Sequence, residues 1–358
     1  SEPGAGATAT TSPASSEAVK SPRSADAPVA KRKATTVTAG SPWVLNILQA
    51  VEAPVLQGLW NSVQPPDGSF LTPLTDTPRV SQGFGGDYAE TANGHARGRP
   101  PAGDTPGARL ARGAYLIVLD AESGNGHTLL ANSANNGPVG DALVHELITE
   151  LEKRFPLEPR APARLLRGHS SGGWSAIWLA ATYPETFGAA WATSPDPVDF
   201  RRLQLVDIYS RPNMYLEQPP GAGVGGSDGP PMRDTPSLRR GERELMTIRQ
   251  ENAIEEVLGP RNTSGQQWDS WMAVFGPRGA DGNPAALYDS WTGEITPGLS
   301  EAFRAYDIGS RLRSEPGRLG PIFKQRIRVA VGDQDTYYLN EAVALLKWDL
   351  DALSFIHL

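Results

Sequence analysis

The sequence predicts an α/β fold in which helices cover both faces of a mostly parallel sheet. Two observations carry this prediction. From residue 114 onward, short apolar runs rich in β-branched residues alternate with helical patterns, as they do in proteins built from βαβ units. Near the middle of the chain, a Gly-x-Ser-x-Gly motif lies between a short strand pattern and an apolar helix pattern. Such a motif marks a sharp strand-to-helix turn.

Composition limits the class of protein. Of the 358 residues, 39% are hydrophobic, which is enough for a sizeable core. The apolar runs are far shorter than the roughly 18 residues that a spanning helix needs, so no membrane span is expected. The net charge of −7 provides no basic field to attract nucleic acid, and none is expected as a partner. The absence of cysteine excludes disulfides and thiolate chemistry.

The first forty residues differ in composition from the rest. They are mostly Ala, Ser, Thr, Pro and Gly, and such a segment buries too little apolar surface to offset the entropy lost on ordering. We therefore expect a disordered leader over residues 1–40 and an α/β domain over residues 41–358. The leader is similar to the mature start of an exported bacterial protein, so a secreted or periplasmic location is expected.

Strand and helix patterns alternate up to and around the motif. Residues 114–120 form a continuous apolar run, which is typical of a buried parallel strand. Residues 141–155 have leucines at spacings of four, which predicts an amphipathic helix. A short strand over 163–167 precedes the motif, an apolar helix over 174–182 follows it, and another strand is expected over 187–193.

The alternation resumes near the end of the chain. A buried strand is predicted over residues 327–331, a helix over 340–349 and a last strand over 353–357.

Residues 194–326 are too long for a connection and predict a cap-like insertion over one edge of the sheet. Within it, we expect a charged helix over 237–258 and a Trp-rich loop over 268–291. Indole side chains in this loop can line an acyl, aryl or sugar pocket, or can form the core of the cap, and the sequence leaves both open. The tryptophans concerned are Trp268, Trp271 and Trp291.

Ser170 is the candidate nucleophile, because it is the central serine of the Gly-x-Ser-x-Gly motif over residues 168–172. Acyl transfer also needs backbone N–H donors for the developing oxyanion. The residue after the nucleophile, Ser171, supplies one donor. The Gly-rich segment 83–87 lies upstream of the first predicted strand, and Phe84 within it is the candidate for the second.

A nucleophilic serine needs a histidine base that a carboxylate orients. In this architecture the order along the chain is serine, acid, histidine. Asp335 is the preferred acid, because it stands a few residues past the end of the strand over 327–331, whereas Asp333 is expected to cap the turn. Asp196 and Asp199, which follow the preceding strand, are the weaker alternative.

The histidine is less clear from the sequence. Of the five histidines, only His357 follows the preferred acid. The base is therefore expected to be His357 or a histidine beyond Leu358, with His127 the next candidate. No histidine pair at helical spacing and no phosphate-binding glycine loop is present in the sequence, so no metal and no cofactor is expected.

The chain from about residue 80 resembles the putative esterase family of α/β-hydrolases, which includes esterase D, enterochelin esterase, feruloyl esterases and mycolyltransferases. The resemblance rests on GFGGD, on ELITELEKRF followed by RLLRGHSSGGWSA, on YPETFGAAWATSP and on VAVGDQD. It implies an α/β-hydrolase fold, with Ser170 as the nucleophile, Asp335 as the acid and a histidine after the last strand.

Three functions remain open from the sequence. The first is a hydrolase of carboxylic esters that acts through an acyl-enzyme on a small-molecule or saccharide-linked ester. The second is an acyltransferase with the same acyl-enzyme and an alcohol or sugar acceptor. The third is a non-catalytic binding protein on a hydrolase scaffold, which applies where no histidine reaches Ser170.

Overall fold

The computed structural model describes most of the chain from residue 115 onward. The described residues are 34–37, 72–73, 115–117, 119, 121–217 and 232–355. The chain divides into two compact units, Ser1–Arg32 and Lys33–Leu358, and every described residue lies in the second. Of the segment expected to be a leader, residues 34–37 form a strand, and the others lie outside the described residues.

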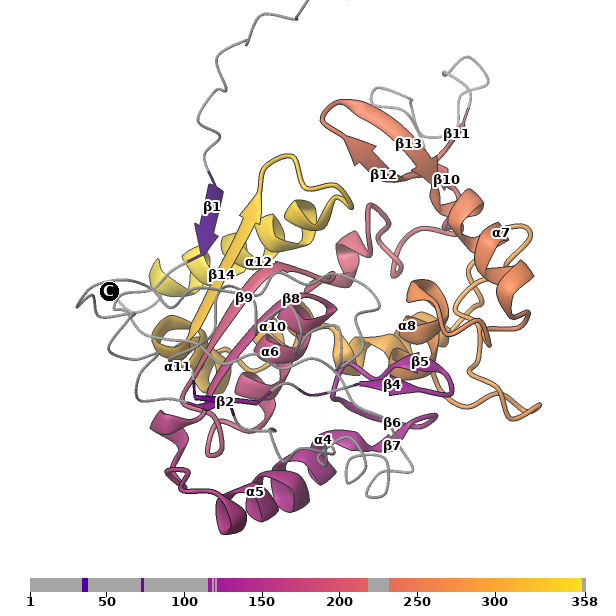
Figure 1. Ribbon diagram of the computed structural model, residues 1–358. Coiled ribbons are helices and arrows are strands. Elements are labelled where there is room, and N and C mark those ends of the chain that lie inside the picture. The colour runs from indigo at the N-terminus through magenta and orange to yellow at the C-terminus, as the bar shows by residue number, and fades with distance from the viewer. Residues whose placement is uncertain are drawn as a thin grey trace, which may run out of the picture. The chain divides into compact units, whose positions relative to one another are not determined.

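A four-stranded sheet positions the motif (Figure 1). Its strand order is β1 (Ala34–Val37), β14 (Ile327–Gly332), β9 (Ala189–Pro195) and β8 (Leu165–Ser170). β8, β9 and β14 run parallel, whereas β1 pairs antiparallel with β14. The three parallel strands are those that the sequence predicts around residues 163–167, 187–193 and 327–331. The carboxyl ends of β8 and β9 therefore meet at one edge of the sheet.

Three helices pack on this sheet and a fourth packs on two of them, and all four lie behind the sheet in Figure 1. α6 (Ser171–Thr182) follows β8 directly and packs on β8 and β9. α11 (Pro316–Arg326) and α12 (Leu339–Phe355) pack on β14 and β9, and α10 (Ile308–Ser314) packs on both of these helices. α10 and α11 fall inside the range 194–326 that the sequence predicts as a cap. The structure places them in the helical layer of the sheet.

Between residue 121 and β8 lie a helical stretch and four short strands. The helix predicted over 141–155 is confirmed as α4 (Val139–Asp141), a π-helical segment (Ala142–Leu147) and α5 (Ile148–Arg154) in succession. The strands form two antiparallel pairs, β4 (Glu122–Ser123) with β5 (Gly126–His127), and β6 (Asn132–Ser133) with β7 (Gly137–Pro138). Single 3-10 turns occur at Ala161–Ala163, Phe200–Arg202 and Arg304–Tyr306.

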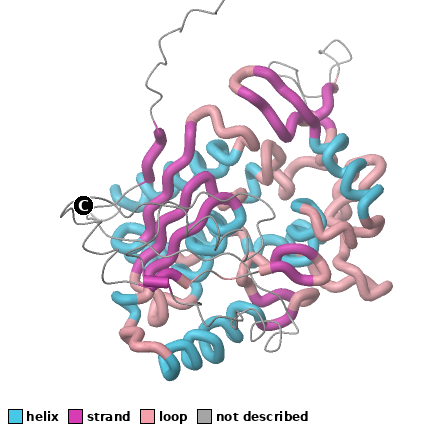
Figure 2. The backbone as a smooth tube through the Cα atoms, viewed as in Figure 1, coloured by secondary structure: helices cyan, strands magenta, loops and turns pink. Residues whose placement is uncertain are grey.

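The segment between β9 and α10 consists of short strands, helices and long loops (Figure 2). Its strands are β10 (Leu216–Glu217), β11 (Arg233–Asp234), β12 (Pro236–Arg240) and β13 (Arg243–Thr247). Its helices are α7 (Ile248–Leu258), α8 (Gln267–Phe275) and α9 (Leu299–Phe303). β10 pairs with β11, and β12 pairs with β13, both antiparallel.

Two expectations for this segment were wrong. The helix predicted over 237–258 begins only at residue 248, where the side chain of Thr247 and that of Gln250 form a capping box. The residues before it form the β12–β13 hairpin, whose turn contains Gly241 at φ 61°. The loop predicted over 268–291 begins instead with α8, because its apolar residues recur at helical spacing.

Two predicted strands also differ from the structure. The run over 114–120 contributes β3 (Tyr115–Leu116), which pairs antiparallel with β2 (Thr72–Pro73) rather than in the parallel sheet. The last strand predicted over 353–357 is replaced through Phe355 by the end of α12. Short apolar runs do not distinguish a strand from a buried helix. Among the described helices, none is long and apolar enough to cross a membrane.

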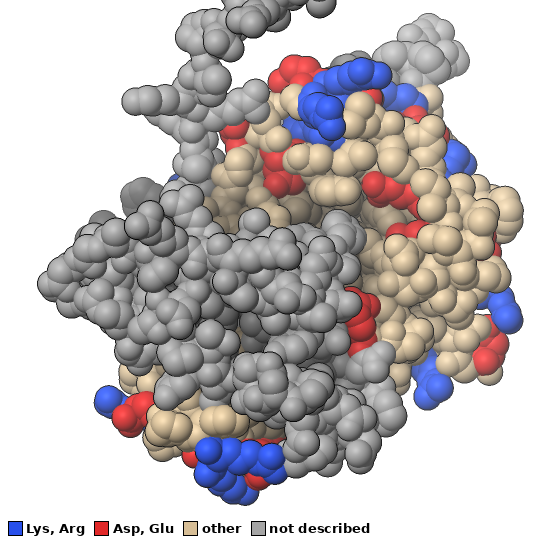
Figure 3. Space-filling view, viewed as in Figure 1, with Lys and Arg blue, Asp and Glu red and all other residues tan. Residues whose placement is uncertain are grey.

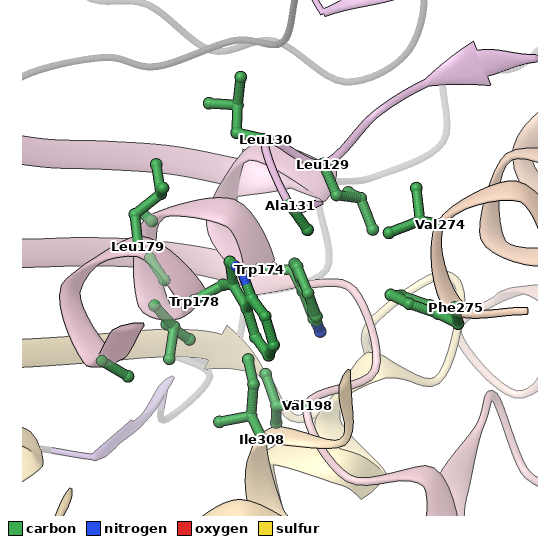
Figure 4. Close-up of a cluster of buried hydrophobic side chains, with 14 of the residues drawn as sticks. Leu129, Leu130, Ala131, Trp174, Trp178, Leu179, Val198, Val274, Phe275 and Ile308 are labelled. Atoms are coloured by element: carbon green, nitrogen blue, oxygen red, sulfur yellow. The ribbon is translucent and has the colours of Figure 1, made fainter. Parts of the chain in front are cut away.

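Apolar residues of α6 form the centre of the core (Figure 4). The rings of Trp174 and Trp178, one turn apart, stack with their centroids 5.0 Å apart. The ring of Trp174 also lies 5.3 Å from that of Phe275 at the end of α8. Because α6 is buried nearly all round, it fixes the position of the turn at its N-terminus.

Candidate active site

Ser170 occupies a strained turn between β8 and α6. It is the last residue of β8, and its backbone has φ 53° and ψ −122°, a region that residues with a side chain rarely adopt. A Cβ on Gly168 would lie 1.8 Å from the carbonyl oxygen of Gly172, so the first glycine of the motif permits this close approach. The strand-to-helix turn that the motif predicts is therefore present.

Asp196 connects the end of β9 to Ser170. This residue is 2% exposed, and its Oδ1 accepts a hydrogen bond from Ser170 Oγ at 3.1 Å. Its Oδ2 accepts hydrogen bonds from Ser171 Oγ at 2.7 Å, Gln267 Nε2 at 3.0 Å and Trp271 Nε1 at 3.0 Å. A buried carboxylate needs donors of this kind to offset the loss of its hydration. These bonds tie Ser170 and Ser171 to α8.

His127, on β5, is the histidine that the described structure brings to this group. Its Nε2 lies 3.4 Å from Ser171 Oγ. Burial lowers the pKa of His127, and the charge of Asp196 acts in the opposite direction. The adjacent Gly126 has φ 84°, and a Cβ there would lie 2.1 Å from Ser270 Oγ, so a glycine lets this hairpin approach α8 closely.

A cavity of about 170 Å³ opens beside Ser170. Ser170 and Asp196 contribute from the ends of β8 and β9, and the remaining residues come mainly from α7, the start of α8 and the segment before α12. These remaining residues are Gln204, Glu251, Ile254, Glu255, Gln266, Gln267, Trp268, Tyr337 and Leu339. The segment between β9 and α10 thus supplies most of the cavity lining beside the candidate nucleophile.

Two glutamates on α7 line this cavity, and neither is among the residues predicted from the sequence. Glu255 accepts hydrogen bonds from the backbone N–H groups of Trp268 and Asp269, both at 3.0 Å, and burial raises its pKa to about 7. Glu251 accepts one from Trp268 Nε1 at 3.0 Å, and burial raises its pKa as well. Their spacing of four residues in a charged helical pattern was the available signal.

Asp335 holds the segment that leads from β14 to α12. Its Oδ1 accepts hydrogen bonds from the backbone N–H of Tyr337 at 2.9 Å and of Leu339 at 3.1 Å. Both of these residues line the cavity. Asp333 is exposed. The role of Asp335 as the acid of the site stays a prediction.

The other carboxylate considered, Asp199, forms ion pairs away from the serine. It is fully buried and binds Arg201 Nη2 at 2.7 Å and Arg313 Nη1 at 2.5 Å. Arg201 and Arg313 also bind Asp349 of α12. Asp199 thus connects the loop after β9 to α10 and α12.

Two predicted site residues lie outside the described residues. They are Phe84, the second oxyanion donor, and His357, the base. Both assignments stay predictions.

The tryptophans of the insertion divide between the two uses that the sequence left open. Trp268 and Trp271 are both 1% exposed and pack edge to face, so they belong to the core of the cap. Trp268 also lines the cavity, and Trp271 donates to Asp196. Trp291 is 76% exposed, so it is not part of the core, and it is not among the residues that line the cavity.

Part of this chain is similar to a known protein family. Residues 132–279 match the putative esterase family, which confirms the resemblance and supports a hydrolase of ester substrates. No curated protein sequence matches the chain. The structure of FphF, a fluorophosphonate-binding serine hydrolase of Staphylococcus aureus, with substrate bound, is 24% identical over 27% of this chain, with a TM-score of 0.23. The matched part spans 36% of the length of that protein.

Proposed function

We propose that this chain, whose residues 132–279 match the putative esterase family, hydrolyses carboxylic esters through an acyl-enzyme on Ser170. The observation that carries the proposal is the backbone of Ser170, held at φ 53° beside a cavity. Strain of this kind persists only where the surroundings enforce it, and it concentrates at active sites. Here it places a hydroxyl group at the N-terminus of a twelve-residue helix.

In the proposed reaction, Ser170 Oγ attacks the carbonyl carbon of the ester and a histidine takes the hydroxyl proton. The carbonyl oxygen becomes an oxyanion, which the N–H of Ser171 stabilises from the N-terminus of α6. The amide of Phe84 is the proposed second donor. The alcohol leaves with the proton, and water then hydrolyses the acyl group from Ser170.

The proposed base is a histidine, and His357 and His127 are its candidates in this chain. His127 has the support of its position, since Ser171 Oγ lies between its Nε2 and Asp196. His357 has the support of its place after Asp335 in the sequence. Asp335 is the proposed acid for His357, and Asp196 is the corresponding carboxylate for His127.

The proposed substrate is a small-molecule ester that enters the cavity beside Ser170. Acyl transfer to an alcohol uses the same acyl-enzyme and differs only in the acceptor. The proposed location is outside the cytoplasm, which only the composition of the first forty residues supports.

The test compares Ser170→Ala with Ser175→Ala, a control one turn along the same helix. Ser175 Oγ donates to the carbonyl oxygen of Ser171 at 2.9 Å, so its loss perturbs the same turn and leaves the nucleophile in place. With short-chain p-nitrophenyl esters, Ser170→Ala is expected to lower kcat by roughly 10⁴–10⁶-fold, and Ser175→Ala by less than about tenfold. Equal turnover by both variants would refute the proposal.

Two further measurements complete the test. Intact mass spectrometry after exposure to a fluorophosphonate should show one adduct on the wild type and none on Ser170→Ala. Of His127→Asn and His357→Asn, the variant that lacks the base should lose activity by orders of magnitude. Glycerol or glucose is then added as an acceptor. If most of the acyl group is recovered on this acceptor and not as the free acid, acyl transfer is favoured over hydrolysis.

A further inference from the structure

The cavity beside Ser170 is lined by hydrogen-bond acceptors and acids. From this lining we infer that the ester substrate carries a protonated amine and that Glu251, Glu255 and Gln204 bind it. The inference rests on the proposed function, since it assigns the substrate class of the same site. Three observations carry it, namely the charges of the lining, an acceptor without a donor, and the size of the cavity.

The described lining contains three acidic residues, Asp196, Glu251 and Glu255, and neither Lys nor Arg. The carboxylate of Asp196 already accepts four hydrogen bonds from side chains. Glu251 and Glu255 are four residues apart on α7 and therefore share one face of the helix. Figure 3 shows acidic side chains, drawn red, around a hollow in the face that it presents.

Glu251 and Glu255 accept hydrogen bonds from neutral groups in the structure described. These donors are the indole of Trp268 for Glu251, and the backbone amides of Trp268 and Asp269 and the hydroxyl of Ser264 for Glu255. Burial raises the pKa of both glutamates, and these hydrogen bonds lower it only in part. A buried carboxylate is stabilised most by a cation at hydrogen-bond distance, and the cavity gives a cation access to both.

Gln204 provides an independent observation. This residue is 3% exposed and lines the cavity, and its Oε1 has no hydrogen-bond partner among the described residues. Its backbone has φ 57°, so the fold holds it in an unfavourable conformation at this position. A buried amide oxygen without a donor is costly and rare. An N–H of a bound ammonium group would supply the donor.

The remaining lining residues suit the carbon part of a small amine. Ile254 and Leu339 are aliphatic, and Trp268 and Tyr337 are aromatic. An apolar cavity of about 150 Å³ accommodates a benzene ring, and this cavity measures about 170 Å³. An alkylammonium group of a few carbons therefore fits, with its ester at Ser170.

The test uses two esters of equal shape, 2-(dimethylamino)ethyl acetate, which is protonated near neutral pH, and 3-methylbutyl acetate, which is neutral. We expect the wild type to prefer the amine ester in kcat/KM by roughly tenfold, which corresponds to about 1.4 kcal/mol. Glu251→Gln should reduce this ratio to near one. The matched control is Glu256→Gln, which removes a carboxylate from the same helix outside the cavity lining and should keep the ratio.

Acetylcholine and its neutral isostere 3,3-dimethylbutyl acetate test the N–H donor. The quaternary ammonium cannot donate to Gln204. The enzyme should therefore prefer acetylcholine over its neutral isostere by less than it prefers the tertiary amine ester over its own. Gln204→Met should lower the preference for the amine ester and change that for acetylcholine little. This variant also keeps the inference testable where Glu251→Gln does not fold.

A ratio near one in the wild type, with hydrolysis that depends on Ser170, would overturn the inference and leave the proposed function intact. So would a preference for glyceryl monoacetate, a neutral polyol ester, that exceeds the preference for the amine ester. If neither ester is hydrolysed, the proposed function fails. The cavity is then tested separately, by titrating dimethylethylammonium into Ser170→Ala and following the binding of the ammonium by NMR. Saturable binding that Glu251→Gln abolishes would support the subsite, and no binding would refute it.

Discussion

Glu255 links the stability of this fold to pH. Its carboxylate accepts the backbone N–H groups of Trp268 and Asp269 at the start of α8, and burial raises its pKa from 4.5 to about 7. Between these two values, the folded protein retains a proton that the unfolded chain has released. The free energy of unfolding therefore falls as pH rises from about 4.5 to about 7. At 1.36 kcal/mol per pH unit, a difference of about 2.5 amounts to about 3 kcal/mol.

The assay is urea unfolding of the wild type and of Glu255→Gln at about pH 5 and about pH 8. From pH 5 to pH 8, the free energy of unfolding of the wild type should fall by between about 2 and 3 kcal/mol more than that of Glu255→Gln. The variant cannot ionise at this position. The comparison uses the change with pH, so an equal cost of the substitution at both pH values cancels.

Glu150→Gln is the matched control. A hydrogen bond from Arg154 lowers the pKa of Glu150, so this group titrates below about pH 4.5 and should leave the difference between pH 5 and pH 8 unchanged. The reasoning would be refuted if the free energies of unfolding of the wild type and of Glu255→Gln changed in parallel from about pH 5 to about pH 8.

Two further pairs of variants test the turn and the cap. Gly168→Ala should destabilise the protein by more than about 3 kcal/mol, because its Cβ would overlap the carbonyl group of Gly172. Gly317→Ala has open space around its Cβ, so it should be neutral or stabilising by about 0.5–1 kcal/mol. Thermal unfolding measures both. Trp268→Ala should cost about 3–5 kcal/mol and Trp291→Ala less than about 0.5 kcal/mol, because the first side chain is buried and the second is exposed. Similar midpoints in urea for the two tryptophan variants would contradict the assignment of Trp268 to the core.

The parallel part of the fold could be predicted because its signals are local. The strand before the motif, the helix after it and the amphipathic helix over 141–155 each have a periodicity that their neighbours do not disturb. The hairpin over 236–247 was missed because its charged residues also suit a helix, and tertiary pairing decided between the two. The end of α12 was missed because a short apolar run over residues 353–357 also suits a strand. In the structure, Leu350 and Leu353 continue the helical spacing of α12 and pack against the core.

The candidate nucleophile could be predicted because its motif spans adjacent residues. Ser170 and Ser171 follow from five consecutive positions, and the structure places both at the expected turn. Glu251, Glu255 and Gln204 reach the same cavity from segments 34 to 85 residues away, and the helical spacing of the two glutamates does not indicate that approach. A carboxylate on a charged helix is usually solvated, so burial at this position had to come from the tertiary structure.

The hydrogen bond between Ser170 and Asp196 sets a condition on the proposed reaction. To give its proton to a histidine, Ser170 Oγ must turn away from Asp196 Oδ1, for which it is the donor in the structure described. The three donors to Oδ2 stay in place, so the carboxylate keeps its position while Oδ1 becomes free. A freed oxygen on a buried carboxylate needs a new donor. The condition for attack is therefore a donor in the cavity, which Asp196 itself lines.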